Sequence, residues 1–383
     1  MSTNISCHIC NSNDIKQIKA PQNFSQVTSD CRPWNSKLKM VICSNCGVVQ
    51  KLINSDWVED TKKIYDEYQV YAQGSGNEQL IFDSTIGYSI PRSEKIVVWL
   101  NNEINLPQSG KLIDIGCGNG SFLKQFNNKN SEWLLNGLEL DNRNEKIINS
   151  IPNTELKVCE LSEIKEEYDL VVLIHALEHI IDPLTFLKKI KSILKKTGFI
   201  FIEIPNLKMA PFDILIADHC SHFTVETLEI LLNKAGFVIN KISEDFIPKE
   251  ITLIASVKEE ISLKDIDISL GMDLVTGYFL NLDEIFKQAK LISGNFGVFG
   301  TSISATWLAS EFLERVDFFV DEDINRIGGN YMGKPVYGIE NCPSNTNVLM
   351  PLRYDIASKV IDRLRENCKI NFIIPPKTNY NGK

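Results

Sequence analysis

Three alternating glycines form a short loop that could bring the backbone close to a ligand. Gly116, Gly118 and Gly120 lie in the segment LIDIGCGNGSFL and follow an apolar run that ends at Asp114. Glycine permits a tight turn and leaves no side chain between the backbone and a bound molecule. In open α/β sheets, ligands bind at such loops, outside the carboxyl ends of the strands. The segment therefore predicts a ligand-binding loop after a buried strand.

The spacing of the loop separates several classes of ligand. A phosphate-binding P-loop ends in Gly-Lys-Ser or Gly-Lys-Thr, but here Gly120 is followed directly by Ser121. A dinucleotide-binding loop has the pattern G-x-G-x-x-G, whereas this loop has G-x-G-x-G. An acidic residue at the end of the next strand would bind ribose hydroxyl groups. Glu139 in GLELD is the candidate, with Asp141 as the alternative.

Four of the ten cysteines form two pairs with the spacing of metal ligands. The N-terminus has no basic segment followed by an apolar one, so we expect no secretory signal and a reducing, cytoplasmic compartment. Paired cysteines there favour a metal ion over disulfides, and four thiolates make the closed site typical of structural zinc. His8 and Cys31 are less favoured ligands because the two pairs already complete a site. The expected ligands are Cys7, Cys10, Cys43 and Cys46.

The middle of the chain alternates between strand and helix patterns. Buried apolar strands between amphipathic helices predict an α/β fold with a doubly wound, mostly parallel sheet. We expect one helix from Pro183 to Gly198, and another that begins after Thr224 and ends at Gly236. The last two strands, FVINKISE and ITLIASVKE, are expected to form an antiparallel hairpin.

Four segments are expected along the chain. In the second, Tyr65, Tyr68 and Tyr71 are three residues apart and would share one face of a helix. The last segment repeats the strand–helix alternation of the middle one. In order, the segments are a zinc-binding domain (1–60), an aromatic linker or lid (61–95), the main α/β domain (96–260) and a second, smaller Rossmann-like α/β domain (270–383).

The composition is that of a soluble globular protein with an acidic balance. The chain has 383 residues, 43% of them hydrophobic, and a formal net charge of −9. Such a chain repels the phosphate backbone of nucleic acids unless it has a local basic patch. The best basic cluster, LKKIKSILKK, has the spacing of an amphipathic helix with a solvated face. No apolar run approaches the ~20 residues that span a bilayer. We expect neither nucleic acid nor membrane as a partner.

Three segments in combination resemble class I S-adenosylmethionine-dependent methyltransferases: LIDIGCGNGSFL, YDLVVLIHALEHIIDP and LEILLNKAGF. The resemblance implies that S-adenosylmethionine binds at the glycine loop. Glu178 and His179 follow the strand in the second segment, and we interpret His179 as structural. The implied cofactor contacts are Asp114, Gly116, Gly118 and His175 toward the methionine end, Glu139 toward the ribose, and Cys159 and Glu160 beside the adenine, with Cys117 and Leu140 as further contacts.

The order of the segments resembles a narrower family, the three-domain sugar C-methyltransferases. The resemblance implies methylation of a carbon atom of a nucleotide-linked keto sugar. In that family, a Tyr-x-Glu-His segment after the fifth strand carries acid/base residues. The matching segment here, IADHCSHFT, keeps the histidine as His219 and a shorter carboxylate as Asp218, and it has Ile216 in place of the tyrosine.

The chemistry gives each residue of this segment an expected role. Methylation of carbon beside a ketone needs a base and a donor for the enolate oxygen, whereas methylation of oxygen needs one base. Histidine carries protons near neutral pH, so His219 is the expected base and Asp218 the residue that orients it. Tyr71 and His222 are the expected substrate contacts, and either could replace the missing tyrosine. The atom that is methylated stays open.

The sequence favours a methyltransferase that acts on a small acceptor, such as a nucleotide-linked sugar, in surface-polysaccharide or secondary-metabolite biosynthesis. Its expected cofactors are S-adenosylmethionine and structural Zn²⁺. One alternative is an RNA methyltransferase with a zinc module, which the net charge of −9 opposes. Another is a non-catalytic cofactor-binding scaffold, which the missing tyrosine supports.

Overall fold

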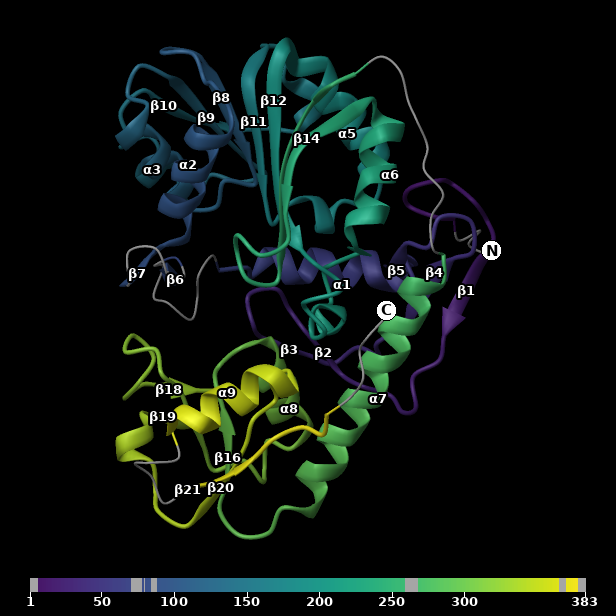
Figure 1. Ribbon diagram of the computed structural model, residues 1–383, viewed down its shortest axis with the longest axis vertical. Helices are drawn as coiled ribbons and strands as arrows, with labels where there is room; N and C mark the ends of the chain where they lie inside the picture. The colour runs from purple at the N-terminus through teal and green to yellow at the C-terminus, as the bar shows by residue number, and fades with distance from the viewer. Residues whose placement is uncertain are drawn as a thin grey trace.

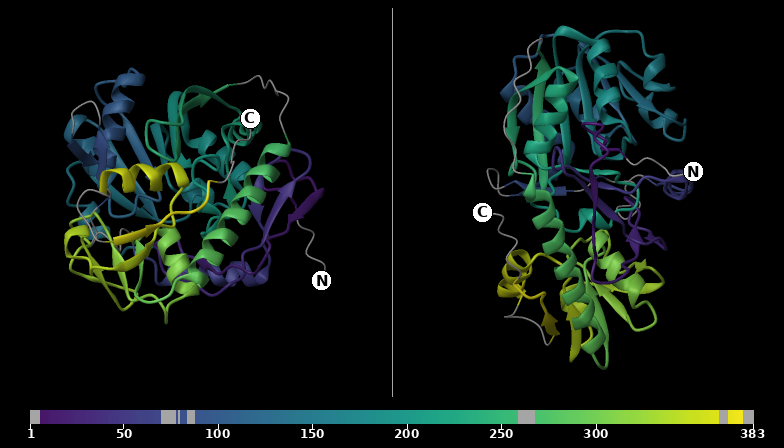
Figure 2. Two further views of the ribbon diagram at one scale, coloured as in Figure 1. Left: turned by 60° about the horizontal axis from the view of Figure 1, so that its bottom comes forward. Right: turned by 90° about the vertical axis from the view of Figure 1, so that its right-hand side faces the viewer.

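Two α/β units lie at opposite ends of the protein, with the N-terminal segment between them (Figure 1). Two further views show the same arrangement, with the long helix α7 (Ser269–Leu291) running beside the N-terminal segment and the second unit (Figure 2). This arrangement gives the N-terminal segment contacts with both units. The computed structural model describes residues 6–69, 78, 80–83, 88–258, 268–364 and 370–377.

The larger unit is built on a seven-stranded sheet with the order β10-β9-β8-β11-β12-β15-β14. The first five of these strands run parallel to one another. β15 is antiparallel to both β12 and β14, so the expected terminal hairpin is confirmed. The strands are β8 (Lys111–Ile115), β9 (Leu134–Glu139), β10 (Thr154–Val158), β11 (Tyr168–Ile174), β12 (Leu194–Pro205), β14 (Phe237–Ser243) and β15 (Glu250–Val257).

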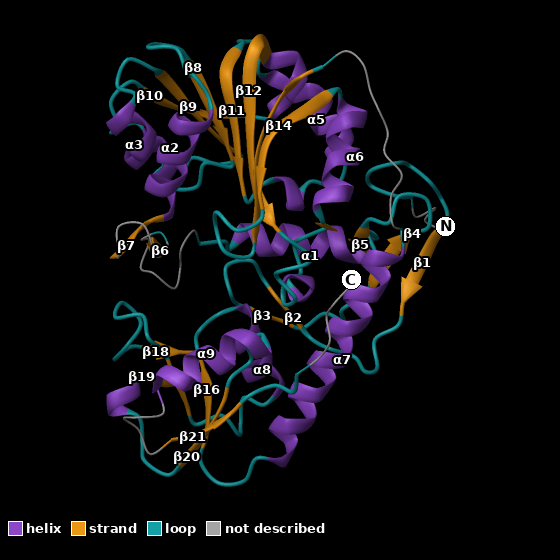
Figure 3. Ribbon diagram, viewed as in Figure 1, coloured by secondary structure: helices purple, strands orange, loops and turns teal. Residues whose placement is uncertain are grey.

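Helices cover both faces of this sheet (Figure 3), as a doubly wound fold requires. One hydrophobic core includes residues of α2 and α3, and the other includes residues of α5 and α6. Helix α6 begins and ends as expected, with Thr224 as its N-cap and Gly236 in the left-handed conformation as its C-cap. The helices are α2 (Arg92–Glu103), α3 (Ser121–Lys129), α4 (Glu145–Ile148), α5 (Pro183–Ile193) and α6 (Val225–Ala235).

Helix α5 is shorter than the sequence suggests. It ends at Ile193 rather than at Gly198, and β12 begins at Leu194. Leu194 pairs with Tyr168 of β11, and the register then shifts before the pair Leu170 and Phe199. The residues from Leu194 onward therefore form a strand, although their apolar spacing also fits a helix.

The N-terminal segment forms a small sheet that includes a strand from the larger unit. Its order is β1-β4-β5-β13, and β13 (Ser221–His222) comes from the segment IADHCSHFT. Helix α1 crosses the expected boundary at residue 60. The remaining elements are β1 (Ile15–Ile18), β2 (Gln26–Val27), β3 (Pro33–Trp34), β4 (Met40–Cys43), β5 (Val49–Lys51), α1 (Ser55–Asp66), β6 (Leu80–Asp83) and β7 (Tyr88–Pro91).

The C-terminal unit is a second α/β sheet with the order β18-β19-β17-β16-β20-β21, parallel apart from β18. The ring of Trp307 in α8 lies edge-on to Phe24 of the N-terminal segment, with their centroids 5.8 Å apart. Among the described residues, no helix is long and apolar enough to cross a membrane. The elements are α7 (Ser269–Leu291), β16 (Phe296–Phe299), α8 (Ile303–Glu311), β17 (Phe318–Val320), β18 (Asn330–Tyr331), β19 (Lys334–Tyr337), β20 (Thr346–Leu349), α9 (Tyr354–Leu364) and β21 (Ile370–Ile373).

Candidate functional site

The glycine loop leaves the carboxyl end of β8 and leads into α3. Gly116, Gly118 and Gly120 have φ angles of 76°, 57° and 80°, in the left-handed region that favours glycine. The N–H of Gly116 donates to the carbonyl of Leu138 at 2.9 Å, which fixes the loop to the end of β9. Gly116 itself is exposed. The backbone of the loop is therefore both held in place and open to a ligand.

Glu139 at the end of β9 reaches the glycine loop. Its Oε1 accepts a hydrogen bond of 2.6 Å from the N–H of Gly118, and burial raises the pKa of this carboxyl group. The alternative acid, Asp141, is instead paired with Arg143 at 2.6 Å on the surface. Leu140, between the two acids, is 73% exposed. Glu139 is thus the acid that can meet a ligand of this loop.

The other expected cofactor residues differ in what they offer. Asp114 is 2% exposed beneath the loop, and burial together with the charge of Glu139 raises its pKa well above the usual value. The side chain of Cys117 packs inward against Gly137. Its Sγ lies so close that a Cβ on this glycine would be only 2.5 Å away. Glu160 caps the short helix η2 (Leu161–Glu163) with its side chain. Cys159 packs against the core beneath.

Buried charges surround His175, directly after β11. Its Nδ1 lies 3.0 Å from Oε1 of Glu178, and its Nε2 contacts the guanidinium of Arg92. Arg92 also donates to the buried Glu203 at 2.7 Å. Burial and Arg92 lower the pKa of His175, but the carboxylates of Glu250 and Glu178 outweigh them, so the pKa is raised. A charged cluster therefore lies at the carboxyl end of β11.

Asp213 joins the two histidines of the candidate acid/base segment. It lies on the short helix η4 (Asp213–Leu215), and its two carboxylate oxygens are 2.7 Å from Nδ1 of His219 and 2.5 Å from Nδ1 of His222. Burial lowers the pKa of His219, but the charge and hydrogen bond of Asp213 raise it to about 9. Burial outweighs the same carboxylate at His222, whose pKa is lowered. Sequence reasoning missed Asp213, since it precedes the recognisable segment.

The contacts of Asp218 and His222 do not fit the roles that the sequence predicts for them. Asp218 accepts hydrogen bonds from the N–H and hydroxyl of Ser29, at 2.9 and 2.5 Å, and makes none with His219. The carboxylate that orients His219 is therefore Asp213. His222 is 1% exposed and is held between Asp213 and β5, so its contacts are those of a supporting residue. Tyr71 lies outside the described residues.

His179, interpreted as structural, lies against His219. It is part of the short helix η3 (Leu177–His179), and the two imidazole rings meet edge-on with centroids 4.6 Å apart. Its Nδ1 lies 2.9 Å from the hydroxyl of Tyr65 and 3.0 Å from the carbonyl of Asp218. Burial and the charge of His219 lower the pKa of His179. Tyr65 is thus a linker tyrosine that the structure brings to this cluster.

The four expected zinc ligands come together. The Sγ atoms of Cys7 and Cys46 are 3.4 Å apart, those of Cys10 and Cys43 are 3.5 Å apart, and all four lie within 4.8 Å of one another. Zinc–sulfur bonds of ~2.3 Å place tetrahedral ligands about 3.8 Å apart, so the set fits this ion. Backbone N–H groups point at the sulfurs, as from Asn45 to Cys43 at 3.3 Å. His8 and Cys31 are not part of the cluster.

The N-terminal segment with the four cysteines pairs directly with the segment IADHCSHFT. β13 pairs with β5, with Ser221 opposite Gln50 and His222 opposite Val49. Nδ1 of His8, next to Cys7, lies 2.8 Å from the hydroxyl of Ser221. The strand that contains Cys43 and the strand that contains His222 therefore belong to one sheet.

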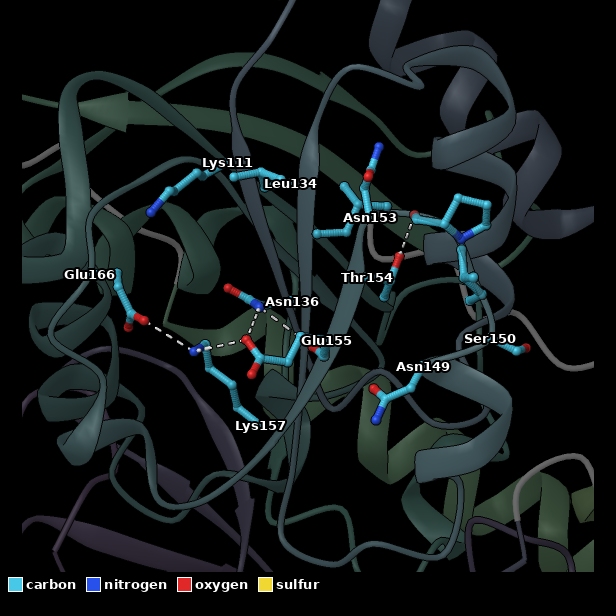
Figure 4. Close-up of a pocket in the computed structure, with 13 residues that line it drawn as sticks. Lys111, Leu134, Asn136, Asn149, Ser150, Asn153, Thr154, Glu155, Lys157 and Glu166 are labelled. Carbon is cyan, nitrogen blue, oxygen red and sulfur yellow. Dashed lines mark hydrogen bonds and ion pairs between the residues drawn. The ribbon is translucent and has the colours of Figure 1, made fainter.

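A polar hollow lies away from these residues (Figure 4). Its lining includes Lys111 and Leu134, which begin β8 and β9, and Lys157, which pairs with Glu166 at 3.0 Å. It thus lies at the amino ends of the strands, whereas the glycine loop lies at their carboxyl ends. We do not assign it to the site.

The sequence between α2 and β14 matches a known family. A family described as "Methyltransferase domain" matches residues 95–242. This stretch, less than half of the chain, is similar to a methyltransferase domain. The matched residues include the glycine loop, Glu139, His175, Asp213 and the whole of IADHCSHFT.

Individual proteins match this chain at low sequence identity and over only part of its length. A "Ubiquinone biosynthesis O-methyltransferase" from Acinetobacter baylyi is 25% identical over 117 residues, which span 28% of this chain and 49% of that protein. A solved S-adenosylmethionine-dependent methyltransferase from Clostridium acetobutylicum is 12% identical and covers 53% of this chain and 98% of its own, with a TM-score of 0.36. CalO1, a methyltransferase in calicheamicin biosynthesis, is 16% identical and covers 44% of this chain and 54% of its own, with a TM-score of 0.35.

Proposed function

We propose that the protein transfers a methyl group from S-adenosylmethionine to a small acceptor, a nucleotide-linked keto sugar or a similar molecule. The observation that carries this proposal is the hydrogen bond between Gly118 and Glu139 inside a segment that matches a methyltransferase domain. An exposed glycine backbone beside a carboxylate is suited to an adenosyl ligand that carries no pyrophosphate.

The cofactor residues have separate tasks in this proposal. The loop at Gly116 and Gly118 would lie along the amino-acid part of the cofactor, and Glu139 would accept hydrogen bonds from its ribose hydroxyl groups. Exposed Leu140 offers an apolar surface next to the ribose. When bound, S-adenosylmethionine supplies a methyl group that is already activated on a sulfonium. The chain has only to orient the acceptor and handle its proton.

His219 is the proposed base. Asp213 accepts a hydrogen bond from its Nδ1–H, which fixes the ring and leaves Nε2 with the lone pair that takes a proton. The cation that then forms is stabilised by the same carboxylate, which is why the pKa of His219 rises to about 9. His222 shares Asp213 from the other side and supports its position.

The proposed acceptor site lies where the three parts of the chain meet. Ser29 of the N-terminal segment holds Asp218, and Trp57 of α1 donates to the carbonyl of Ala217 at 2.9 Å. Tyr331 of the C-terminal unit donates to the carbonyl of Cys31 at 2.8 Å. An acceptor beside His219 would therefore lie near all three parts, which supports a substrate larger than a single ring.

We also propose that the four cysteines hold structural zinc. Their sulfur spacing and the N–H groups aimed at them support this, and a closed set of four thiolates leaves no position for substrate.

Binding calorimetry with S-adenosylmethionine and S-adenosylhomocysteine tests the proposal. We expect one site per chain with micromolar affinity, within the ~1 μM–1 mM range usual for enzyme substrates. No binding of either molecule would refute the proposed function. Mass spectrometry of nucleotides that copurify with the chain then tests the acceptor class.

A further inference from the structure

A second set of possible metal ligands lies inside the methyltransferase domain. It consists of Glu178, His179 and His219, and one ligand atom of each lies within 4.8 Å of those of the other two. Glu178 and His179 follow β11, and His219 follows β12, so the set forms at the carboxyl ends of two neighbouring strands. Ligand atoms ~2.1 Å from a tetrahedral ion are about 3.4 Å apart, which small side-chain rotations would reach.

In each histidine of the set, Nδ1 is engaged by a hydrogen bond. Nδ1 of His219 contacts the carboxylate of Asp213 at 2.7 Å, and Nδ1 of His179 contacts the carbonyl of Asp218 at 3.0 Å. The carboxylate and the carbonyl can only accept hydrogen bonds, so each Nδ1 carries a proton, and the Tyr65 hydroxyl, 2.9 Å from Nδ1 of His179, can accept as well. Nε2 is then the nitrogen of each ring that an ion could bind, after displacing any proton there. Metal-binding histidines are usually held in this way, by an oxygen acceptor behind the ring.

Glu178 supplies an independent indication of a missing ligand. The residue is 1% exposed, and its Oε1 is 3.0 Å from Nδ1 of His175. Its Oε2 is buried without a hydrogen-bond partner. A buried carboxylate oxygen without a partner is costly, and a cation would satisfy it.

We propose that Glu178, His179 and His219 bind a divalent first-row transition-metal ion at a site separate from the four cysteines. Two imidazoles and one carboxylate are a ligand set used by zinc and by iron, cobalt and nickel ions. Three protein ligands leave at least one coordination position open, unlike the closed cysteine site.

The effect of this ion on turnover rests on the proposed function. An ion on Nε2 of His219 occupies the lone pair that would take the acceptor's proton. The ion and the proton exclude each other there, so the loaded protein would be inhibited. Ion binding itself needs neither cofactor nor acceptor and can be measured without them.

The test is titration of the zinc-loaded full-length protein with Co²⁺ alone, followed by calorimetry and visible absorption. We expect one equivalent of Co²⁺ per chain without the charge-transfer bands of thiolate ligands. Glu178→Gln and, as a second variant, His179→Gln should each weaken this binding at least tenfold, since loss of even an outer partner of a ligand typically costs 10–100-fold.

Glu250→Gln is the matched control. Glu250 is partly buried near His175, at 3.6 Å from its Nε2, and has a buried, unpartnered Oε2, but it is outside the ligand set. The Glu250→Gln variant should bind Co²⁺ as the wild type does. Zinc content and circular dichroism show whether each variant is folded. No added equivalent in the wild type, thiolate bands, or equal weakening in Glu178→Gln and Glu250→Gln would overturn the proposal. Binding of S-adenosylmethionine, measured separately, decides the proposed function.

Discussion

One carboxylate oxygen of Asp213 lies 2.7 Å from Nδ1 of His219, and both side chains are almost fully buried. The carboxylate fixes the ring and favours its charged form, which raises the pKa of His219 to about 9. In the free protein, His219 therefore carries a proton at neutral pH. It can act as a base only in the fraction of molecules that have lost this proton.

The first prediction follows from this protonation. With His219 as the base, kcat/KM should rise about tenfold per pH unit below its pKa and level off above it. Asp213→Asn removes the charge that raises the pKa, so the rising part of the profile should move to lower pH. Its plateau should fall, because the ring loses its orientation. Steady-state kinetics from pH 6 to 10, with a chelator that keeps the histidines free of metal, measure both effects.

Asp218→Asn is the matched control for this profile. Asp218 is as buried as Asp213 but is held by Ser29 instead of touching His219. Its charge still acts on His219 from a distance, so a smaller shift in the same direction is expected. If Asp213→Asn lowers the rate at every pH without moving the profile, His219 is not the base.

The second prediction concerns the two acids after β9. Glu139→Ala should weaken binding of S-adenosylhomocysteine by ~10–100-fold, the loss expected for hydrogen bonds to a charged group worth ~1.5–3 kcal/mol. Asp141→Ala should change the affinity less than threefold, because Asp141 pairs with Arg143 on the surface. Calorimetry with both variants measures the difference. Equal losses in the two variants would contradict the assignment of Glu139.

The fold was largely predictable because its signals are local. Apolar strands, the Thr224 and Gly236 caps and the final hairpin each follow from neighbouring residues. The end of α5 was not predictable in this way. LKKTG continues the amphipathic spacing of the helix, and only the pairing of Leu194 with Tyr168 in the sheet turns it into strand.

The candidate site was less predictable because its contacts join distant residues. The sequence indicates which residue types lie near His219, but not whether Asp213 or Asp218 accepts its hydrogen bond. Asp218 instead accepts a hydrogen bond from Ser29, which is 189 residues earlier in the chain. His179 meets His219 because β11 and β12 are neighbours in the sheet, and no spacing within either segment shows this.

The third prediction concerns Lys51, which is fully enclosed between the N-terminal segment and the candidate site. Its Nζ donates to Gln26 at 2.7 Å and to the carbonyl of Ile214 at 2.5 Å, next to Asp213. Burial lowers its pKa to about 7. In the unfolded chain the group keeps its ordinary pKa near 10.4, so between these values the unfolded state binds more protons. Stability should therefore rise with pH in this window.

The measurement is the free energy of unfolding in urea at several pH values. Lys51 alone should add a slope of up to ~1.4 kcal/mol per pH unit between about pH 7 and 10. Lys51→Met should remove this contribution, and Lys39→Met serves as a control at an exposed lysine of the same segment. The same pH dependence in Lys51→Met and wild type would show that the lysine is not the source.

The fourth prediction concerns the link between the cysteine cluster and the methyltransferase domain. Cys46→Ser removes one proposed zinc ligand, and loss of a structural ion destabilises the elements it joins. β5 should then hold β13 less firmly, so His222 and Asp213 lose their support. The glycine loop and Glu139 belong to other strands. Turnover should therefore fall at least tenfold while the affinity for S-adenosylhomocysteine changes less than threefold.

Hydrogen exchange distinguishes this local effect from unfolding of the whole protein. In Cys46→Ser, amides of β5 and β13 should lose protection, while those of β8 and β9 keep it. Cys342→Ser is the control, since this cysteine lies in the C-terminal unit, away from the cluster. Because Ser221 also contacts His8, His8→Ala should loosen β13 in the same direction but more weakly, with its zinc retained. If cofactor affinity falls together with turnover in Cys46→Ser, the ion supports the whole fold and not the histidine segment in particular.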